Sequence, residues 1–241
     1  MKRTIQPLTI VHLYPRDMNI YGDWGNVLTL KRRAEWHGYD ATIIAVNPGD
    51  TIPDHTDLIV GGGGQDSGQS VIQDDLLQRG PEIIRLGERN VPMLVICGLY
   101  QLFGHFFQTK DGERIGGIGL FDIETYGSDT RMIGNIVTST DFGDIIGYEN
   151  HSGMTVLGEN QKPFGIVKKG AGNNGRDKTE GARWRHVYGS YLHGSLLPKN
   201  PVFADALLEA ACLHRYGEYE PQIIDDRFAV SARRIAASRP R

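Results

Sequence analysis

Cysteine is scarce in this sequence: the 241 residues include only two, Cys97 and Cys212, and they lie far apart. Two distant cysteines give no disulfide framework and fit a reducing compartment, so we expect a cytoplasmic protein. The sequence also has no Cys-x-x-Cys motif and no paired-histidine spacing. It therefore carries no metal signature.

Long apolar runs are missing as well. The stretch 8–14 is interrupted by His12 and followed by Pro15, Arg16 and Asp17, which makes it too short and too polar for a signal peptide or a membrane span. The formal net charge of -3 leaves no positive excess that would attract a nucleic-acid backbone. We therefore expect no membrane insertion and no nucleic acid, but a small molecule or another protein as partner.

What the sequence does contain is an alternation of short apolar runs and helical patterns over its first half. The runs cover residues 8–13, 41–46, 57–60 and 92–96. Between the first two, Val27, Leu30 and Ala34 recur at helical spacing, and Gly38 stands where a helix would end. This rhythm predicts an α/β fold with a mainly parallel central sheet flanked by helices.

Two further helices are predicted around the fourth run. Pro81 fits the first turn of a helix over Ile83, Ile84 and Leu86, because the N–H that proline lacks has no intrahelical partner there. After Cys97, an apolar face at helical spacing predicts another helix, formed by Leu99, Leu102, Phe103 and Phe106.

The second half has the pattern of extra strands and loops on the same domain, with β-like runs at 132–137 and 187–192. Residues 201–216 predict a closing helix that Asn200 caps. We assign residues 1–225 to one domain and residues 226–241 to a basic tail. From Arg227 onward the tail holds five arginines and no acidic residue, so it is either a solvated tail or a docking arm.

Cys97 stands between an apolar run and a helical pattern, in the string VICGLYQLFG at 95–104. A nucleophile is exposed in this way on a sharp strand-to-helix turn. The helix N-terminus favours the thiolate over the thiol, and the N–H of Gly98 can point at a developing oxyanion. A buried structural cysteine is the alternative for Cys97, and it is the favoured interpretation for Cys212 in the closing helix.

A cysteine nucleophile needs a base, and His193 is the best placed of the eight histidines. It ends a β-like run and precedes Gly194, so its imidazole should project from a strand end. His151 has similar surroundings and is the second candidate.

Four consecutive glycines, residues 61–64, follow the third apolar run. Such a loop can offer closely spaced N–H groups to a phosphate or an oxyanion, although a flexible turn is the alternative. The motif GxxxxGK[ST] occurs nowhere in the chain. We therefore expect no nucleotide-phosphate site.

Together these three segments resemble the class I glutamine amidotransferases, which have a flavodoxin-like fold, and among them the cobyric acid synthase branch. The resemblance rests on CGLYQ at 97–101 and YLHG at 191–194, in this order after the glycine loop. It sharpens toward the GatD-type glutaminase subunits of lipid II isoglutaminyl synthase. The segments that carry this are YGDWGN at 21–26, GYENHSG at 147–153, GNN at 172–174 and LPKN at 197–200.

The resemblance implies that Cys97 is the nucleophile of a glutaminase and His193 its general base. Arg131 would hold the substrate carboxylate, a task that suits a planar guanidinium because it can bind in bidentate fashion. Other implied contacts are those of Gln101 with glutamine, and of the N–H groups of Gly98 and of Gly63, or a neighbour of Gly63, with the oxyanion.

The resemblance also implies a partner, a MurT-type Mur-ligase-like synthetase. That partner would use ATP and Mg to activate the D-glutamate of the lipid II peptidoglycan stem, and it would accept the ammonia. This chain would then need no cofactor of its own. The complex would be cytoplasmic and lie near the inner membrane face through lipid II.

Two positions depart from the class I pattern. Class I enzymes commonly place a glutamate two residues after the histidine, where this chain has Ser195. The third member of the triad must then come from elsewhere, and Asp23 is the first candidate and Glu149 the second. Leu99 replaces a usually small residue, which we expect to tune the activity.

Three alternatives remain open. A cobyric-acid-type glutaminase would use the same Cys97 chemistry with another acceptor, although that family usually carries a fused ATP-binding domain with a phosphate loop. A standalone γ-glutamyl hydrolase would be fully active without a partner. A non-enzymatic flavodoxin-like domain would only bind a ligand or regulate a partner, and its Cys97 would be unreactive.

Overall fold

The computed structural model describes residues 7–240, so the first six residues of the predicted domain and Arg241 of the predicted tail lie outside it. A central six-stranded sheet has the order β11-β12-β4-β3-β1-β2. Its neighbouring strands are parallel except for β11, which runs antiparallel to β12. The strands are β1 (Leu8–Leu13), β2 (Ala41–Val46), β3 (Leu58–Gly61), β4 (Met93–Ile96), β11 (Ala182–Trp184) and β12 (Val187–Ser190). The four predicted strands of the first half are thus confirmed.

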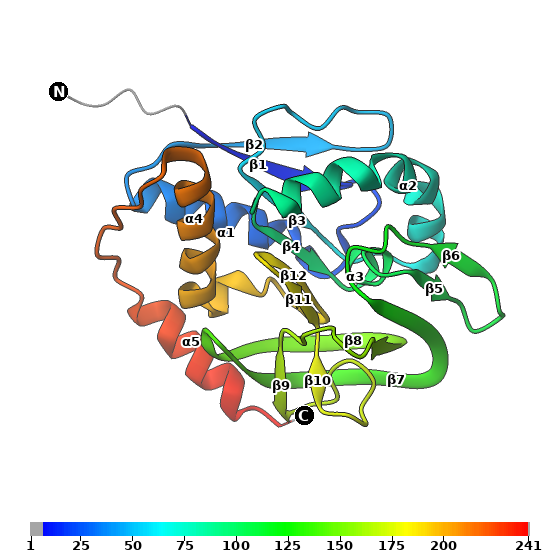
Figure 1. Ribbon diagram of the computed structural model, residues 1–241. Helices are drawn as coiled ribbons and strands as arrows, with labels where there is room; N and C mark the ends of the chain where they lie inside the picture. The colour runs from blue at the N-terminus through cyan, green and yellow to red at the C-terminus, as the bar shows by residue number, and fades with distance from the viewer. Residues whose placement is uncertain (1–6, 241) are drawn as a thin grey trace.

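Helices cover both faces of this sheet (Figure 1). The predicted crossover helix is α1 (Trp24–Trp36), and it buries Val27, Leu30 and Ala34 as expected. The crossover from β3 to β4 is α2 (Asp66–Glu88). Because the two crossovers run in opposite directions along the sheet, right-handed connections place α1 and α2 on opposite faces. The predicted closing helix is α4 (Pro201–Tyr216), which packs beside α1.

Two helix predictions of the first half are wrong in extent. Pro81 does not begin a helix but lies inside α2, because a buried stripe continues on both sides of it from Ile72 to Ile83. Tertiary burial thus outweighs the lost backbone hydrogen bond. After Cys97, α3 (Gly98–Leu102) has only five residues, and Phe106 belongs to a strand, β5 (Phe106–Gln108).

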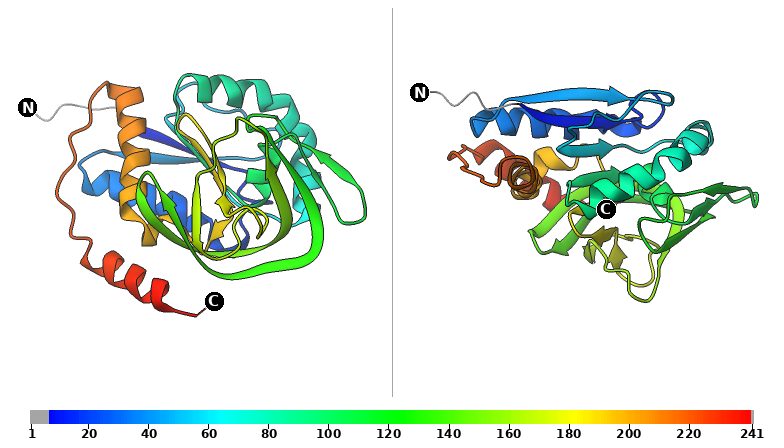
Figure 2. Two further views of the ribbon diagram at one scale, coloured as in Figure 1. Left: turned by 60° about the horizontal axis from the view of Figure 1, so that its bottom comes forward. Right: turned by 45° about the horizontal axis from the view of Figure 1, so that its top comes forward.

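The second half builds another sheet, which Figure 2 shows wrapped beside the first. Its largest part is a hairpin of two long antiparallel strands, β7 (Ile123–Thr140) and β8 (Gly143–Leu157), with a register shift between Gly127 and Met132. The predicted run at 132–137 is only the middle of β7, because much of the rest is polar and partly exposed. Smaller strands complete it: β5, β6 (Arg114–Gly116), β9 (Gly165–Lys169), β10 (Thr179–Glu180) and β13 (Leu192–His193).

Asn200 occupies the N-cap position of α4, but its side chain does not cap the helix. Its amide instead bonds to both the N–H and the carbonyl of Ile146 in β8, and to the carbonyl of Leu196. Pro201 at the first helical position has no N–H to be capped. The buried amide therefore ties β8 to the turn η2 (Leu197–Lys199) rather than serving the predicted cap.

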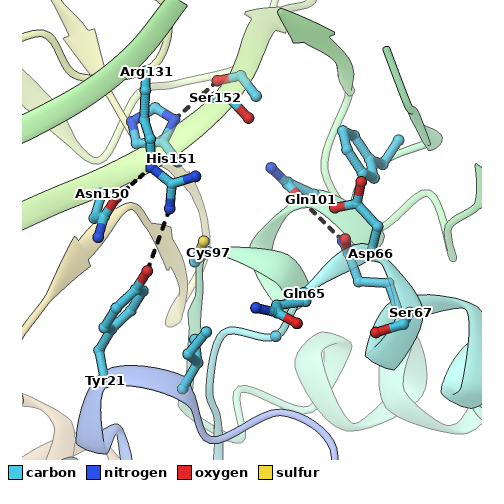
Figure 3. Close-up of a pocket in the computed structure, with 15 residues that line it drawn as sticks. Tyr21, Gln65, Asp66, Ser67, Cys97, Gln101, Arg131, Asn150, His151 and Ser152 are labelled. Carbon is cyan, nitrogen blue, oxygen red and sulfur yellow. Dashed lines mark hydrogen bonds between the residues drawn. The ribbon is translucent and has the colours of Figure 1, made fainter. Parts of the chain in front are cut away.

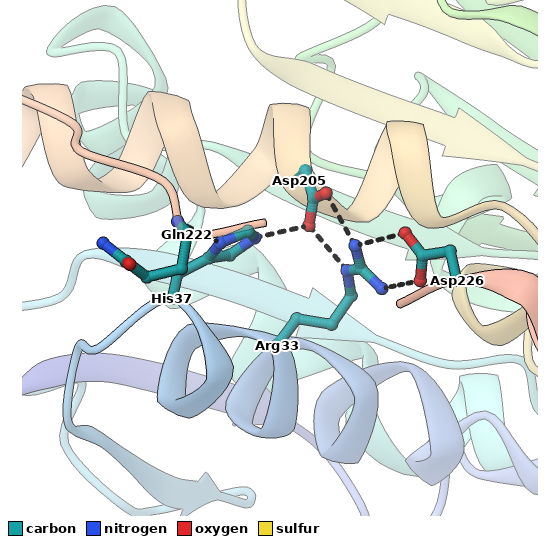
Figure 4. A network of polar contacts seen from close by, with 5 residues as sticks. All are labelled: Arg33, His37, Asp205, Gln222 and Asp226. Atoms are coloured by element: carbon teal, nitrogen blue, oxygen red, sulfur yellow. Dashed lines mark hydrogen bonds and ion pairs between the residues drawn. The ribbon is translucent and has the colours of Figure 1, made fainter. Parts of the chain in front are cut away.

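Most of the predicted basic tail is helical. Residues Arg227–Ser238 form a helix, α5, that has no buried residue and rests on β7, β8 and η2. The buried guanidinium of Arg33 in α1 binds Asp205 of α4 and Asp226, the residue just before α5 (Figure 4). His37 adds a contact of 3.1 Å with Asp205. This network fixes the place where α5 begins.

Within residues 7–240, no helix is both long and apolar enough to cross a bilayer.

Candidate active site

Four segments meet at one edge of the central sheet, because each follows the carboxyl end of a parallel strand. They are the turn η1 (Ile20–Gly22) with Asp23 after β1, the glycine loop after β3, Cys97 after β4, and His193 after β12. The chain leaves β1 and β3 in opposite directions along the sheet. A crevice opens at such a switch point, outside the carboxyl ends of the strands.

Cys97 forms the sharp turn that the sequence predicts. Its backbone has φ 51° and ψ -105°, a conformation that a non-glycine residue rarely adopts. The N–H of Cys97 donates to the carbonyl of Ser190 at 2.8 Å, so β12 holds the turn from the next strand. The thiol is nearly buried, at 8% exposure, and it reaches the wall of a pocket.

His193 lies next to Cys97. A Cβ atom placed on Gly63 would come within 2.9 Å of both Cys97 Cβ and His193 Cε1, so the two side chains flank one point of the glycine loop. Burial lowers the pKa of His193, but the negative charges of Cys97 and Asp23 raise it, and the net pKa is about 10. His193 therefore keeps its proton near neutral pH.

Asp23 connects this histidine to the glycine loop. Its Oδ1 lies 3.6 Å from His193 Nδ1, and both side chains are 1% exposed. That separation is longer than a hydrogen bond, so the contact is electrostatic. Its Oδ2 accepts the N–H of Gly63 at 2.7 Å. Glu149, the second candidate, instead accepts the N–H groups of Ala171 and Gly172.

His151, the second candidate for the base, is occupied otherwise. Its ring stacks on Tyr191 with the centroids 3.6 Å apart, and its Nδ1 lies 2.9 Å from the carbonyl oxygen of Gly153. Burial lowers the pKa of His151 to about 3. His151 is therefore uncharged at physiological pH and forms part of the pocket wall.

The N–H of Gly63 donates to Asp23 Oδ2, which leaves the neighbour of Gly63 as the candidate for the expected oxyanion contact. Gly64 lines the pocket, and its nitrogen lies 3.0 Å from the place where a Cβ on Gly98 would stand. A side chain at Gly98 would fill this space. The backbones of Gly64 and Gly98 therefore pass close to each other beside Cys97.

The pocket in front of Cys97 has a volume of about 430 Å³. Arg131 lies above the thiol in Figure 3, where its Nε donates to Asn150 Oδ1 at 2.8 Å and its second nitrogen to the Tyr21 hydroxyl at 3.3 Å. Gln101 forms part of another wall, and its amide bonds to Gln69 and to the Tyr191 hydroxyl. The structure thus brings Cys97, Gln101 and Arg131 into one pocket, with His193 and Asp23 packed behind it.

Tyr21 and Asn150 are pocket residues for which the sequence suggests no individual role. Both lie in segments that carry the family resemblance, 21–26 and 147–153, and that is the only signal for them. Leu99, one of the two departures from the class I pattern, is fully buried against Gly61, so it fills space below the sharp turn at Cys97. Cys212 is fully buried in α4, as expected for a structural cysteine.

No group of three or more His, Cys, Asp or Glu side chains in residues 7–240 is arranged to hold a metal ion.

The chain is similar to several known proteins. The subunit GatD of lipid II isoglutaminyl synthase (glutamine-hydrolyzing) from Staphylococcus aureus is 36% identical over 234 residues, which is 96% of each chain. GatD from Streptococcus pneumoniae is 40% identical, over 88% of this chain and 83% of its own.

A crystal structure of a glutamine amidotransferase from Thermotoga maritima superposes with a TM-score of 0.57 over 96% of this chain and 94% of its own, at 14% identity. The flavodoxin-like class I glutamine amidotransferase fold is thereby confirmed. Residues 9–201 match the CobB/CobQ-like glutamine amidotransferase domain. The chain therefore belongs to the CobB/CobQ-like glutamine amidotransferase family.

Proposed function

We propose that this chain is a glutaminase subunit that hydrolyses glutamine through Cys97 and passes the ammonia to a MurT-type Mur-ligase-like synthetase. The synthetase would use it to amidate the D-glutamate of the lipid II stem. One observation carries the proposal: Cys97, His193 and Asp23 meet beside a pocket in which Arg131 forms hydrogen bonds with two neutral side chains, Asn150 and Tyr21.

In the first half of the reaction, the Cys97 thiolate attacks the side-chain carbonyl carbon of glutamine and forms a C–S bond. The N–H groups of Gly98 and Gly64 stabilise the oxyanion. The His193 imidazolium then gives its proton to the amide nitrogen, the C–N bond breaks, and ammonia leaves.

In the second half, neutral His193 takes a proton from water, and the hydroxide attacks the thioester carbon. The C–S bond breaks, glutamate leaves, and the thiolate and imidazolium are restored. Asp23 stabilises the imidazolium at both stages. It also keeps Nδ1 of His193 turned toward the Asp23 carboxylate, so that Nε2 is available for the substrate.

Glutamine recognition falls to Arg131 in this proposal. Its guanidinium is held by two neutral groups, so its positive charge is available for the α-carboxylate of glutamine. Gln101 is fixed at both ends of its amide and shapes the wall beside the thiol.

The names of the relatives support a partner of some kind, because both are subunits of a synthase, and the Mur-ligase-like identity of that partner is part of the proposal. Co-expression with the Mur-ligase-like protein tests it: the complex should convert lipid II to its amidated form with glutamine and ATP, and each chain alone should not. Ammonium salts should replace this chain in the assay. Full glutamine hydrolysis without any complex would instead favour a standalone γ-glutamyl hydrolase, and amidation of a cobyric-acid-type acceptor would favour that branch.

Arg131→Ala is expected to raise the KM for glutamine about 10- to 100-fold, because a charged hydrogen-bonded contact of this kind contributes about 1.5–3 kcal/mol. The kcat should change much less, since Arg131 does not touch the reacting carbon. Steady-state glutamate release measures both constants. An unchanged KM would remove Arg131 from the substrate site.

A further inference from the structure

The turn that carries Tyr21 is held in a strained shape. Tyr21 has φ 60° and ψ 19°, a left-handed conformation that a bulky residue rarely adopts. Three hydrogen bonds fix the turn: Ile20 N–H to the Gly63 carbonyl at 2.9 Å, Trp24 N–H to Asn19 Oδ1 at 2.8 Å, and Ser195 Oγ to the Gly22 carbonyl at 2.7 Å. Strain that persists because its surroundings over-determine it is typical of functional positions.

The Tyr21 side chain reaches two groups of the site at once. Its hydroxyl accepts a hydrogen bond from Arg131 at 3.3 Å. Its ring packs edge-on against His193, with the centroids 4.9 Å apart and the planes at 71°. Tyr21 is 44% exposed, whereas His193 is 1% exposed, so a partly exposed tyrosine ring covers one side of a buried imidazole (Figure 3 shows the Tyr21 hydroxyl below Arg131).

Ser195 fixes this arrangement from the histidine side. It lies two residues after His193 and itself has a positive φ of 45°, and its hydroxyl holds the carbonyl of Gly22. The approach is close, because a Cβ on Gly25 would collide with the Ser195 side chain. The strand end that carries the imidazole and the turn that carries Tyr21 are thus joined by one side-chain hydroxyl.

We propose that Tyr21 is a positioning residue of this site: its hydroxyl aims Arg131 at the substrate carboxylate, its ring shields His193 from water, and Ser195 holds it in place. The inference rests on the proposed glutamine hydrolysis. A flexible arginine that is already aimed loses less conformational entropy on binding. An imidazolium screened from solvent interacts more strongly with the thiolate beside it.

The hydroxyl and the ring predict separable effects. Tyr21→Phe keeps the ring, so the KM for glutamine should rise about 3- to 10-fold, the equivalent of one hydrogen bond, with kcat nearly unchanged. Tyr21→Ala removes both functions, so kcat should fall as well, and iodoacetamide should inactivate the enzyme faster. Ser195→Ala should raise KM in the direction of Tyr21→Phe, because it releases the turn.

Tyr126→Phe is the matched control. It also removes a tyrosine hydroxyl that donates a hydrogen bond, here to Glu124, but Tyr126 does not line the pocket. It should leave both constants unchanged. In an Arg131→Ala background, Tyr21→Phe should add no further rise in KM, since its effect acts through Arg131. Circular dichroism of each variant shows whether it is folded.

Two results would overturn the Tyr21 inference alone. Tyr21→Phe could raise KM equally in the parent and in the Arg131→Ala background, or the Tyr21→Phe enzyme could have the same constants as the parent. A folded parent chain that releases no glutamate, with or without the synthetase, would overturn the proposed function itself.

Discussion

Replacing Cys97 with serine is expected to lower glutamine hydrolysis about 10⁴-fold or more, the range seen when a nucleophile is removed from a catalytic triad. A serine hydroxyl at this place stays protonated and is a far weaker nucleophile than a thiolate. The fold should persist, because serine keeps nearly the same volume and the turn is held by backbone contacts such as Cys97 N–H to Ser190. Glutamate release and the thermal unfolding midpoint measure the two effects.

Cys212→Ala is the control for this experiment. Burial raises the pKa of the Cys212 thiol to about 12, so it stays protonated and takes no part in the reaction. Its removal should leave kcat/KM unchanged. A Cys97→Ser enzyme that releases glutamate at the parental rate would show that the nucleophile is another residue.

Asp23→Asn is expected to lower kcat about 10²- to 10⁴-fold, as when the orienting carboxylate of a triad is made neutral. The amide has nearly the same shape and can still accept the N–H of Gly63 through its oxygen. It cannot stabilise the imidazolium, however, and the pKa of His193 should fall because a negative charge that raises it is gone. The pH profile of kcat should therefore change along with its magnitude.

Glu149→Gln separates the two candidates for this role. Glu149 accepts backbone N–H groups of the 171–172 turn, so its neutralisation should affect stability more than kcat. A large loss of kcat in Glu149→Gln, together with a mild effect of Asp23→Asn, would reverse the assignment.

The sequence predicts best what a single local pattern determines. Parallel strands are buried on both faces, so runs such as residues 92–96 appear as continuous apolar stretches. Their ends locate the site, because Cys97 and His193 follow the carboxyl ends of β4 and β12, which are neighbours in the sheet. The structure brings Cys97 and His193 close together as the sequence predicts, and their work as a catalytic pair stays a prediction.

Features that depend on tertiary packing are harder to predict from the sequence. Pro81 has the pattern of a helix start, but α2 continues through it because both of its halves bury one face. The helical spacing up to Phe106 predicts a helix that is too long, because Phe106 belongs to strand β5. The choice between Asp23 and Glu149 depends on the three-dimensional arrangement, since both lie in short family-like strings. Asp23 Oδ1 lies 3.6 Å from His193 Nδ1, whereas Glu149 accepts the N–H groups of Ala171 and Gly172.

Ser195 illustrates the same limit. In the sequence, Ser195 only marks the position where class I enzymes commonly have a glutamate. In the structure, its hydroxyl donates a hydrogen bond to the turn next to Asp23. The hydroxyl thus joins the strand end that carries His193 to a turn 173 residues away in the sequence, a relation that no local spacing could predict.

Mass spectrometry of the chain after treatment with an alkylating glutamine analogue tests the reactive cysteine most directly. We expect one adduct, on the peptide that contains Cys97, with Cys212 unmodified and with protection by excess glutamine. An unmodified Cys97 in folded protein, or an adduct on Cys212 alone, would contradict it.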